Sequence, residues 1–469
     1  MPFTLHQFEI PGLAQYSYLI ASESRAVVID PMRDTERYTD YISAHKLTLT
    51  HILETHIHAD FASGAPALAA ATGAELALSA HDEGELYRYA MPHRPLRNGD
   101  RIAVGRLTIE ALHTPGHTPE HLSYLLYDND HNPDHPIAIF SGDFLFPGSL
   151  GRPDLLGEDA KVGLAHQLYR SLHNRISHLP DHLRIYPGHG AGSFCGSSIG
   201  AQSQSTLGQE RATTLLYRLD EDEFVRQVLD SVPAMPAYYP RMKQLNSAGA
   251  PSVATLPGNA ALTPGQVHDL AQTHRAVLLD LRSPEDFAAA HIPGAISIGA
   301  GPSLSLWAGW LLDATIPIVL VNNSGDDESS RRALVRVGLD NIAGFLAGGM
   351  HAWTAPNPPA ANLPTARITL LNPEQVQSRL DFAPGQVILL DVRNPSEWNA
   401  GHIPGARHIM LGDLPHKLDT LPTQQPIITV CQAGHRASIA ASLLARAGFQ
   451  NVATLEGGMN AWTLQQTAN

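Results

Sequence analysis

The sequence predicts a multidomain α/β protein. Its 469 residues exceed what one hydrophobic core usually supports, so about two to four domains are expected. Short apolar runs typical of strands alternate with longer stretches typical of helices, and one set of motifs occurs twice in the C-terminal half. Hydrophobic residues at 43% and charged residues at 16% are ordinary proportions for a globular protein.

Charge and cysteine content narrow the class of protein further. A formal net charge of -14 disfavours nucleic acid or an anionic membrane as the principal partner, because both require a basic surface. Residues 1–6 lack a basic region followed by an apolar run, and no stretch has the roughly eighteen apolar residues of a membrane-spanning helix. The two cysteines, Cys195 and Cys431, are too few for a disulfide framework. We therefore expect a cytoplasmic protein with free thiols.

Residues 55–61, with the sequence THIHADF, contain three potential metal ligands in five positions, namely His56, His58 and Asp60. The apolar run before them predicts a short buried strand, and the alanine-rich run after them predicts a helix with Pro66 in its first turn. In a locally extended chain, residues two apart point the same way. His56 and His58 can therefore converge on one point in the loop between strand and helix.

Four predicted strands end in loops that carry histidine or aspartate, after an opening hairpin with strands at 16–20 and 26–31. The three strands that follow the first loop are residues 107–112, 137–140 and 183–186, and their loops carry His117, Asp143 and His189. Because the ends of adjacent strands lie close together, we expect sheet pairing alone to bring these loops together. The sequence therefore predicts a metal site at the strand ends.

The motifs THIHAD, TPGHT, SGDFLF and YPGHG, in this order, resemble those of the metallo-β-lactamase superfamily over about residues 1–245. The resemblance implies an αββα sandwich as the N-terminal domain. Two-metal hydrolases of the superfamily follow the pattern HxHxDH, but this chain has Phe61 at the last position, which cannot bind a metal. The remaining side chains form a poor ligand set for a second Zn²⁺, so we expect a single metal ion.

Within this superfamily, the branch that combines one metal with O₂ chemistry is the persulfide dioxygenases. Their pattern implies one Fe²⁺ per chain with the ligands His56, His117 and Asp143. Two neutral histidines and one carboxylate leave three coordination positions for substrate sulfur and O₂. Zn²⁺ fits the same ligands but has no redox states that would activate O₂. The groups expected to orient the ligands and handle protons are His58, Asp60 and His189.

Cys195 follows His189 by six residues, in a loop rich in glycine and serine. The run GAGSFCG resembles a loop of persulfide dioxygenases that are fused to sulfurtransferases. Two interpretations stay open for this residue. Cys195 is either a small buried side chain or a catalytic thiol that receives or positions persulfide sulfur.

The C-terminal half contains an internal repeat. Matching pairs are LLDLRSPE with LLDVRNPSE, HIPGA with HIPGA, and GGMHAW with GGMNAW, which begin at residues 278 and 389, 291 and 402, and 348 and 457. A helical stretch at 207–229 and a Pro-rich, aperiodic segment at 231–258 precede the repeat, and we interpret the latter as a linker. A second Pro-rich segment, at about 356–364, separates the two copies.

These signatures resemble the rhodanese family over about residues 250–469, which implies two α/β domains. We predict three domains with the boundaries 1–245, 246–360 and 361–469. In the second copy, the run CQAGHR after a predicted strand resembles the rhodanese active loop, with Cys431 as the nucleophile for sulfane sulfur. The N–H groups of a tight loop and the positive end of the following helix favour a thiolate there. Arg436 would brace this loop or attract an anionic substrate.

The first copy has Asn322 at the position of the nucleophile, followed by the acidic run NSGDDE. A carboxamide cannot carry a persulfide, and the acidic loop would repel thiosulfate or sulfite. We therefore expect this domain to be catalytically inactive and to serve as a spacer or docking surface.

The whole layout resembles bacterial persulfide dioxygenases fused to two rhodanese domains. It implies oxidation of a low-molecular-weight persulfide by O₂ to sulfite at the iron, and sulfur transfer through Cys431, with thiosulfate as the joint product. The main alternative is a Zn²⁺-dependent thioester hydrolase of the glyoxalase II kind with appended rhodanese domains, which metal identity and O₂ uptake would distinguish. A weaker alternative is a sulfide sensor that binds metal without turnover. The thiol that carries the persulfide and the oligomeric state, including a homo-oligomer, stay open.

Overall fold

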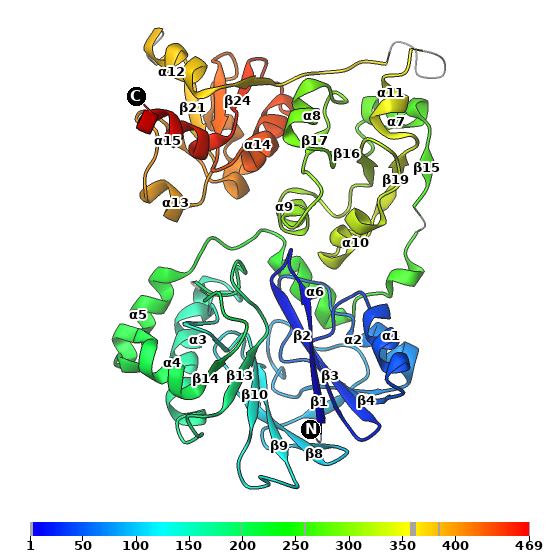
Figure 1. The fold of residues 1–469 in the computed structure, drawn as a ribbon, viewed down its shortest axis with the longest axis vertical. Coiled ribbons are helices and arrows are strands. Elements are labelled where there is room, and N and C mark those ends of the chain that lie inside the picture. Colours follow the sequence, from blue (N-terminus) through cyan, green and yellow to red (C-terminus); the bar gives the residue numbers. More distant parts are fainter. Residues whose placement is uncertain (1–2, 198, 258, 357–362, 383–384, 469) are drawn as a thin grey trace. The chain divides into compact units, whose positions relative to one another are not determined.

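The computed structural model describes residues 3–197, 199–257, 259–356, 363–382 and 385–468. The chain forms two compact units (Figure 1). The first extends to Leu256 and includes Val335–Gly338, and the second contains the rest of the chain from Pro257 onwards. Within the described ranges, no helix combines the length and the apolar character that crossing a membrane requires.

The first unit contains two six-stranded sheets. The strands of the first sheet follow chain order, namely β1 (Phe3–Ile10), β2 (Gln15–Ser22), β3 (Arg25–Ile29), β4 (Thr48–Leu53), β5 (Glu75–Ser79) and β6 (Arg94–Leu96). The second sheet has the order β14 (Ser205–Thr206), β13 (Arg184–Pro187), β10 (Ala138–Gly142), β9 (Leu122–Asp128), β8 (Leu107–His113) and β7 (Arg101–Val104). The short strands β11 (Leu145–Phe146) and β12 (Ser149–Leu150) form a separate hairpin.

The α-helices of the first unit are α1 (Glu36–Ala44), α2 (Ala65–Thr72), α3 (Glu158–Arg170), α4 (Leu207–Thr213), α5 (Glu221–Ser231) and α6 (Tyr239–Ala248). Single turns of other helix types are η1 (Ser171–Arg175), η2 (Leu215–Arg218) and η3 (Val253–Thr255). The stretch predicted to be helical at 207–229 therefore consists of three short pieces, α4, η2 and α5. As predicted, α2 has Pro66 in its first turn, where a missing N–H costs nothing.

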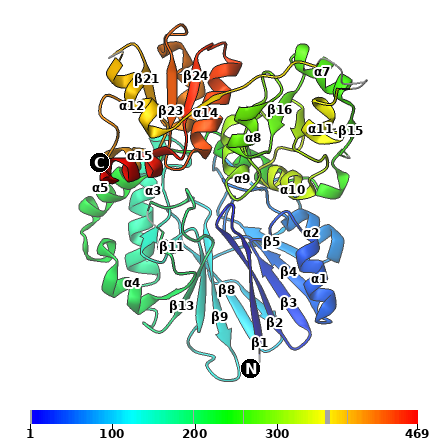
Figure 2. The ribbon, with the colours of Figure 1, turned by 45° about the horizontal axis from the view of Figure 1, so that its top comes forward.

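The two sheets pack face to face. Their shared core includes Ile20 and Val27 from the first sheet and Ile109 and Phe140 from the second. Side chains on the other face of the second sheet, such as Ile139, pack against α3 and α5 in a separate core. On the first sheet, α2 packs against β4 and β5. The layers run helix, sheet, sheet, helix (Figure 2), which confirms the predicted αββα sandwich.

The four loops of the predicted metal site follow strands of different sheets, which corrects one prediction. β4 belongs to the first sheet, whereas β8, β10 and β13 belong to the second. Pairing within one sheet therefore cannot bring the loops together, and the packing of the two sheets does so. The opening hairpin is present as the antiparallel pair of β2 and β3. The additional strand β1 pairs with β2, although its mixed polar and apolar run FTLHQFEI does not indicate a buried strand.

Helix α6 lies where the Pro-rich sequence predicts only a linker. Its buried residues are Tyr239, Met242, Lys243 and Asn246. Their spacing places them on one face of the helix, but two of the four are strongly polar, so the hydropathy pattern does not indicate a helix. α6 also crosses residue 245, where we place the first predicted boundary.

The second unit consists of two repeats, each with a five-stranded parallel sheet of the same strand order. The first repeat has the order β15 (Ala261–Leu262), β19 (Ile342–Leu346), β18 (Ile318–Val321), β16 (Val277–Asp280) and β17 (Ile296–Ser297). The second has the order β20 (Thr369–Leu371), β24 (Val452–Leu455), β23 (Ile427–Val430), β21 (Ile388–Asp391) and β22 (Arg407–His408). The sequence repeat is therefore a repeat of one α/β fold.

The helices of the first repeat are α7 (Pro264–Gln272), α8 (Pro284–Ala289), α9 (Leu304–Leu311), α10 (Glu328–Arg336) and α11 (Gly349–Trp353). Those of the second are α12 (Pro373–Phe382), α13 (Pro395–Asn399), η4 (Leu411–His416), η5 (Leu418–Thr420), α14 (His435–Arg446) and α15 (Gly458–Ala468). Residues 357–362, which include most of the Pro-rich segment expected between the copies and the predicted boundary after residue 360, lie outside the described residues.

The two repeats pack against each other through α14. Ala441 of this helix belongs to the core of the first repeat. Ser438 Oγ lies 3.0 Å from Ser297 Oγ, and Ser442 Oγ accepts a hydrogen bond from the Ser297 N–H at 3.1 Å. Because α14 begins a few residues after Cys431, the first repeat supports the helix that follows this cysteine.

Candidate metal centre and transfer loop

Three of the buried polar atoms that have no hydrogen-bond partner among the described residues lie close together, namely His56 Nε2, His117 Nε2 and Asp143 Oδ2. The carboxylate oxygen lies 3.8 Å from His56 Nε2 and 3.6 Å from His117 Nε2, and the candidate ligand atoms of the three residues lie within 4.8 Å of one another. Buried polar atoms without partners are costly, and a metal ion would satisfy all three. Two imidazole nitrogens and one carboxylate oxygen suit a divalent transition metal.

The other polar atom of each candidate ligand is engaged. The pairs are His56 Nδ1 with Thr55 Oγ1 at 2.9 Å, His117 Nδ1 with Arg152 O at 2.9 Å, and Asp143 Oδ1 with His189 Nδ1 at 2.7 Å. Because a carbonyl can only accept, His117 carries its proton on Nδ1, which leaves Nε2 free for a metal. Burial, and then neighbouring histidines, lower the pKa of His56 and His117 well below the usual value, so both rings are neutral.

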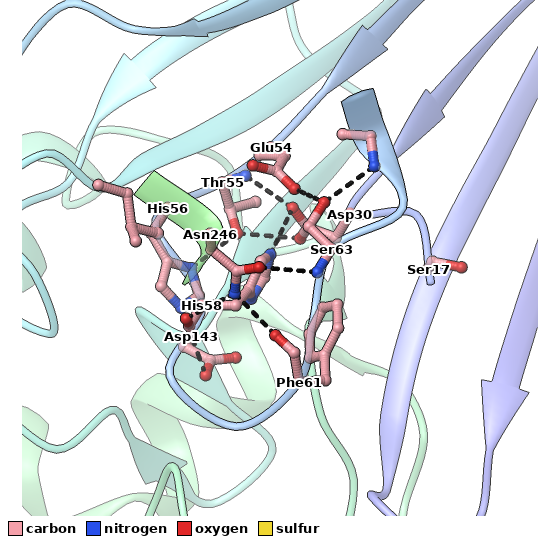
Figure 3. A network of polar contacts seen from close by, with 12 residues as sticks. Ser17, Asp30, Glu54, Thr55, His56, His58, Phe61, Ser63, Asp143 and Asn246 are labelled. Atoms are coloured by element: carbon pink, nitrogen blue, oxygen red, sulfur yellow. Dashed lines mark hydrogen bonds and ion pairs between the residues drawn. The ribbon is translucent and has the colours of Figure 1, made fainter. Parts of the chain in front are cut away.

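His58 lies beside Asp30 rather than with the three candidate ligands (Figure 3). Its Nε2 is 3.2 Å from Asp30 Oδ1, and although burial alone would lower the pKa of His58, this carboxylate raises it. Asp30 also accepts hydrogen bonds from the Thr55 N–H at 2.7 Å and from the Thr55 hydroxyl at 2.9 Å. Asp30 thereby fixes Thr55, whose hydroxyl oxygen contacts His56 Nδ1 and orients the ring. The sequence carries a signal for this role, since Asp30 directly follows the apolar run of strand β3, as the candidate ligands follow theirs.

His189 lies between two carboxylates. Its Nδ1 is 2.7 Å from Asp143 Oδ1, and its Nε2 is 2.7 Å from Asp60 Oδ2. Burial alone would lower the pKa of His189, but Asp143 and Asp60 raise it well above the usual value. Because both ring nitrogens contact carboxylate oxygens, neither is free for a second metal ion in this arrangement. Phe61, whose ring lies 4.4 Å from that of His58, adds no ligand there.

Cys195 lies close to Asp60 and His189. Its sulfur and one potential ligand atom each from Asp60 and His189 lie within 4.8 Å of one another, and the Tyr239 hydroxyl is 4.0 Å from the sulfur. Burial raises the pKa of Cys195 well above its usual value, and the carboxylates of Asp60 and Asp143 raise it further. The thiol is therefore neutral. Cys195 is buried and lies near the candidate metal centre, and its role as a catalytic thiol stays a prediction.

Glycines allow the loops to approach Asp143. A Cβ atom at Gly188 would lie 2.6 Å from Asp143 Oδ1, and one at Gly151 would lie 1.8 Å from the Asp143 carbonyl oxygen. Any larger side chain at these positions would push the loops apart. The close approach of the loops therefore depends on residues without side chains.

Asn246 of α6 holds the backbone of the histidine loop. Its Nδ2 donates hydrogen bonds to the carbonyl oxygens of His58 at 2.9 Å and Phe61 at 2.7 Å, and its Oδ1 accepts one from the Ser63 N–H at 2.9 Å (Figure 3). One side chain therefore fixes three backbone groups of the loop that carries His56. The sequence gives no indication of this role, because Asn246 lies in the expected linker.

Lys243 is a buried cation that contacts the same loop. Its Nζ donates to the Ile57 carbonyl oxygen at 2.9 Å, across 186 positions of the chain, and the Ile57 N–H donates to Glu120 at 2.9 Å. Burial lowers the pKa of Lys243, while the Glu120 carboxylate opposes this shift. The Tyr238 hydroxyl, at the start of the same helix, donates to the Asp60 carbonyl oxygen at 3.1 Å. α6 and the residue before it therefore bind four carbonyl groups of the loop, those of Ile57, His58, Asp60 and Phe61.

The loop after β23 places the Cys431 sulfur against a backbone N–H group. The Gly434 N–H donates to Cys431 Sγ at 3.1 Å, and α14 begins at the next residue. Arg436 donates to both carboxylate oxygens of Glu397, at 2.6 and 2.7 Å, and although burial alone would lower the pKa of Arg436, this carboxylate raises it. The guanidinium group therefore fastens the loop to α13.

The matching loop of the first repeat has the same shape without a thiol. Asn322 Oδ1 accepts hydrogen bonds from the N–H groups of Ser324 at 3.0 Å and Gly325 at 2.6 Å. The carboxamide oxygen therefore takes the place of the sulfur as acceptor. Met350 N–H donates to the Asn322 carbonyl oxygen at 2.8 Å, just as Met459 N–H donates to that of Cys431 at 2.8 Å.

Replacing Asn246 with Ala should weaken metal binding without removing a candidate ligand. Asn246→Ala leaves three buried backbone groups of the loop without partners, each worth on the order of 1–3 kcal/mol. We expect metal affinity, measured by competition with a chelator, to fall roughly 10- to 100-fold. Gln244→Ala, at an exposed position of the same helix, is the matched control. Equal affinities for the two variants would contradict a positioning role for Asn246.

Two protein families match this chain. The model of the metallo-beta-lactamase superfamily matches residues 10–189, and the rhodanese-like domain matches residues 263–356 and 372–465. Persulfide dioxygenase ETHE1, mitochondrial, of Bos taurus is 32% identical over 234 residues, which are 49% of this chain and 82% of the relative. A hydroxyacylglutathione hydrolase of Francisella tularensis subsp. novicida is 31% identical over 178 residues, which are 38% of this chain and 64% of the relative.

A solved structure covers more of the chain. The crystal structure of a metallo-beta-lactamase from Staphylococcus aureus subsp. aureus COL has a TM-score of 0.65 and 35% identity, and the match covers 74% of this chain and 99% of that one. The ranges that the two family models match contain the predicted motifs in their predicted order, except that Gly190 of YPGHG lies one residue beyond. The chain is an enzyme that belongs to the persulfide dioxygenase family of the metallo-β-lactamase superfamily, with two rhodanese-like domains after the metallo-β-lactamase domain.

Proposed function

We propose that this enzyme oxidises a low-molecular-weight persulfide with O₂ to sulfite at one iron ion, and that Cys431 transfers sulfane sulfur so that thiosulfate is the joint product. The observation that carries the proposal is the cluster of three buried ligand atoms, on His56, His117 and Asp143, that lack other partners among the described residues. The relative from Bos taurus is named a persulfide dioxygenase, which supports the substrate class.

An Fe²⁺ ion held by these three residues would supply the redox chemistry with O₂ that Zn²⁺ lacks. The surrounding residues prepare the site for it. Thr55 and Arg152 orient the two neutral imidazole rings, and His189 holds a proton between Asp60 and Asp143. Because these side chains are buried, bulk water is excluded and the electrostatic interactions among them are strengthened.

Cys431 carries the second reaction. Its thiolate attacks the outer sulfur of a persulfide, the bond between the two sulfurs breaks, and the carrier leaves as a thiolate with the electron pair. Sulfite then attacks the outer sulfur now held by Cys431, which forms thiosulfate and returns the thiolate. The Gly434 N–H donates to the sulfur that holds negative charge before and after each cycle. No further oxidant or reductant is needed.

Cys195 has a different proposed role. Its raised pKa and its position between Asp60, His189 and Tyr239 disfavour a thiolate nucleophile. We assign to it the positioning of the persulfide sulfur at the metal centre, by the contact of a neutral, polarizable thiol. The first repeat has no thiol at Asn322, and we assign to it no transfer reaction.

The rival function is hydrolysis of a thioester with Zn²⁺, and a hydroxyacylglutathione hydrolase is among the relatives. Two observations disfavour it. Phe61 replaces a ligand of the two-metal pattern, and both nitrogens of His189 already contact carboxylates. A two-metal hydrolytic centre would need at least one of these positions as a ligand.

The active protein should contain about one iron ion per chain, because Phe61 replaces a ligand of the two-metal pattern and both ring nitrogens of His189 contact carboxylates. His56→Ala, His117→Ala and Asp143→Ala each remove one ligand and should each lower the bound iron at least about tenfold. Elemental analysis after desalting measures the metal, with the exposed His45→Ala as control. Two tightly bound zinc ions per chain in active protein would contradict the dioxygenase proposal.

The first repeat should transfer no sulfur. In the full chain with Cys431→Ser, the loop of Asn322 is the only remaining rhodanese-type loop, and it offers a carboxamide that cannot form a persulfide. We expect thiosulfate:cyanide transfer to fall to the uncatalysed background. Thiocyanate formation above that background would assign an activity to the first repeat and overturn its proposed inactivity.

Cys431→Ser should also separate the two reactions. Serine is similar in size, but its hydroxyl stays protonated near neutral pH and cannot store sulfane sulfur. The variant should still consume O₂ with a persulfide, because the metal site lies in another domain, while its early product shifts from thiosulfate to sulfite. Products are sampled early, since free sulfite and excess persulfide also react slowly without an enzyme. If Cys431→Ser forms thiosulfate as fast as the wild type, Cys431 is not the site of transfer.

A further inference from the structure

His121 is a fully buried histidine that lies beside the candidate metal ligands and directly precedes β9. Its ring is stacked on the ring of His56, with the two centroids 5.1 Å apart and the two planes 24° apart. Its Nε2 accepts a hydrogen bond from the Asp143 N–H at 3.2 Å. One side chain therefore contacts two of the three candidate ligands, the first through its ring face and the second through a backbone group.

The hydrogen bonds of His121 determine which ring nitrogen carries the proton. A backbone N–H can only donate, so Nε2, which receives the Asp143 N–H, has the lone pair, and Nδ1 has the proton. Nδ1 lies 2.9 Å from Thr114 Oγ1, which lies 2.8 Å from Ser123 Oγ. The Thr114 hydroxyl therefore accepts from His121 and donates to Ser123. This chain of hydrogen bonds keeps the lone pair on the side of Asp143.

A comparison of three buried histidines shows why His121 is not itself a candidate ligand. His117 Nδ1 donates to a carbonyl oxygen, and His56 Nδ1 contacts the Thr55 hydroxyl, which donates its own proton to Asp30. All three rings therefore carry the proton on Nδ1 and the lone pair on Nε2. For His56 and His117 this lone pair has no partner among the described residues, whereas that of His121 is occupied by the backbone of the third candidate ligand.

The surrounding backbone holds the His121 ring in place. The Thr114 N–H donates to the His121 carbonyl oxygen at 2.9 Å, so the two residues are joined through backbone and side chain. A Cβ atom at Gly142, the residue before Asp143, would lie 2.7 Å from His121 Nε2. Glycine at this position therefore allows the ring to reach the Asp143 N–H. Without the ring, that buried N–H would lose its acceptor, which is unfavourable.

We propose that His121 is a positioning residue of the metal centre, which holds the Asp143 backbone against the His56 ring while Thr114 keeps Nε2 available as an acceptor. The proposal rests on the proposed binding of one metal ion by His56, His117 and Asp143. Residues that orient metal ligands typically change metal affinity by about 10- to 100-fold, because small displacements of the ligands weaken the bonds. His121 therefore acts on the metal through the ligands and not as a ligand.

The test uses three single variants of the full chain. His121→Phe keeps a flat ring but removes the acceptor of the Asp143 N–H, and Thr114→Val keeps the side-chain shape but removes the acceptor of Nδ1. His173→Phe is the matched control, since the His173 ring of η1 packs 4.2 Å from the ring of Tyr169. Co²⁺ is the probe. Its affinity is measured by competition with a chelator, and its visible absorption bands report the geometry of the ligands without any turnover.

We expect His121→Phe to lower the Co²⁺ affinity about tenfold and to shift the absorption bands, and His173→Phe to keep the wild-type values. Thr114→Val should lower the affinity by less, about threefold, because the ring remains and only the partner of Nδ1 is lost. Since Thr114 acts through His121, the double variant should bind Co²⁺ no more weakly than His121→Phe alone.

Unchanged affinity and absorption bands in His121→Phe, or an equal loss in His173→Phe, would overturn the positioning role. Losses that add up in the double variant would show that Thr114 does not act through His121. If His121→Phe does not fold, Thr114→Val decides by the same two measurements, and wild-type values there contradict the proposal. Wild-type protein that binds no Co²⁺ would contradict the proposed metal centre itself, which separates that failure from a wrong role for His121.

Discussion

The exclusion of water from three ligand atoms is the constraint on which the first unit depends. His56, His117 and Asp143 each present one buried atom without a partner among the described residues, which is unfavourable until a metal binds. Their other atoms are fixed by hydrogen bonds, and Asn246 fixes the loop backbone. The rest of the αββα sandwich has to hold these groups at the junction of two sheets, since neither sheet alone contains all the loops. The centre is therefore organised in advance of metal binding.

Whether the sequence predicts a residue of this site depends on the group that its side chain binds. Candidate ligands are identified by their side-chain chemistry and by their position after apolar strands, so His56, His117 and Asp143 are accessible to sequence reasoning. Asn246 and Lys243 bind backbone carbonyl groups, which every residue type has, so no pairing of side chains indicates their partners. Their polarity also hides α6, because the buried face of that helix is not apolar. Burial of polar residues against a functional loop is the physical reason for this failure.

The fold, too, could be predicted from the sequence only in part. Repeated motifs identify two copies of one parallel sheet, because LLDxR ends a buried strand in both, and Asp280 and Asp391 pair with Val321 and Val430 in equal register. The assignment of β4 to a different sheet from β8 could not be read from strand patterns, since alternation reports burial and not the identity of the neighbouring strand. The packing of α14 on Ser297 could not be predicted either. It involves small residues, Ser438 and Ser442, which could equally pack within their own repeat.

The two cysteines show why residue type alone does not decide reactivity. Both are almost fully buried, at 1% and 2% exposure. Cys195 lies near the carboxylates of Asp60 and Asp143, which oppose a second negative charge. Cys431 lies where a backbone N–H of a tight loop donates to its sulfur and where the positive end of α14 begins. The first environment disfavours a thiolate, and the second places a hydrogen-bond donor against the sulfur. The two sulfurs therefore differ in the groups that surround them, which the residue type alone does not show.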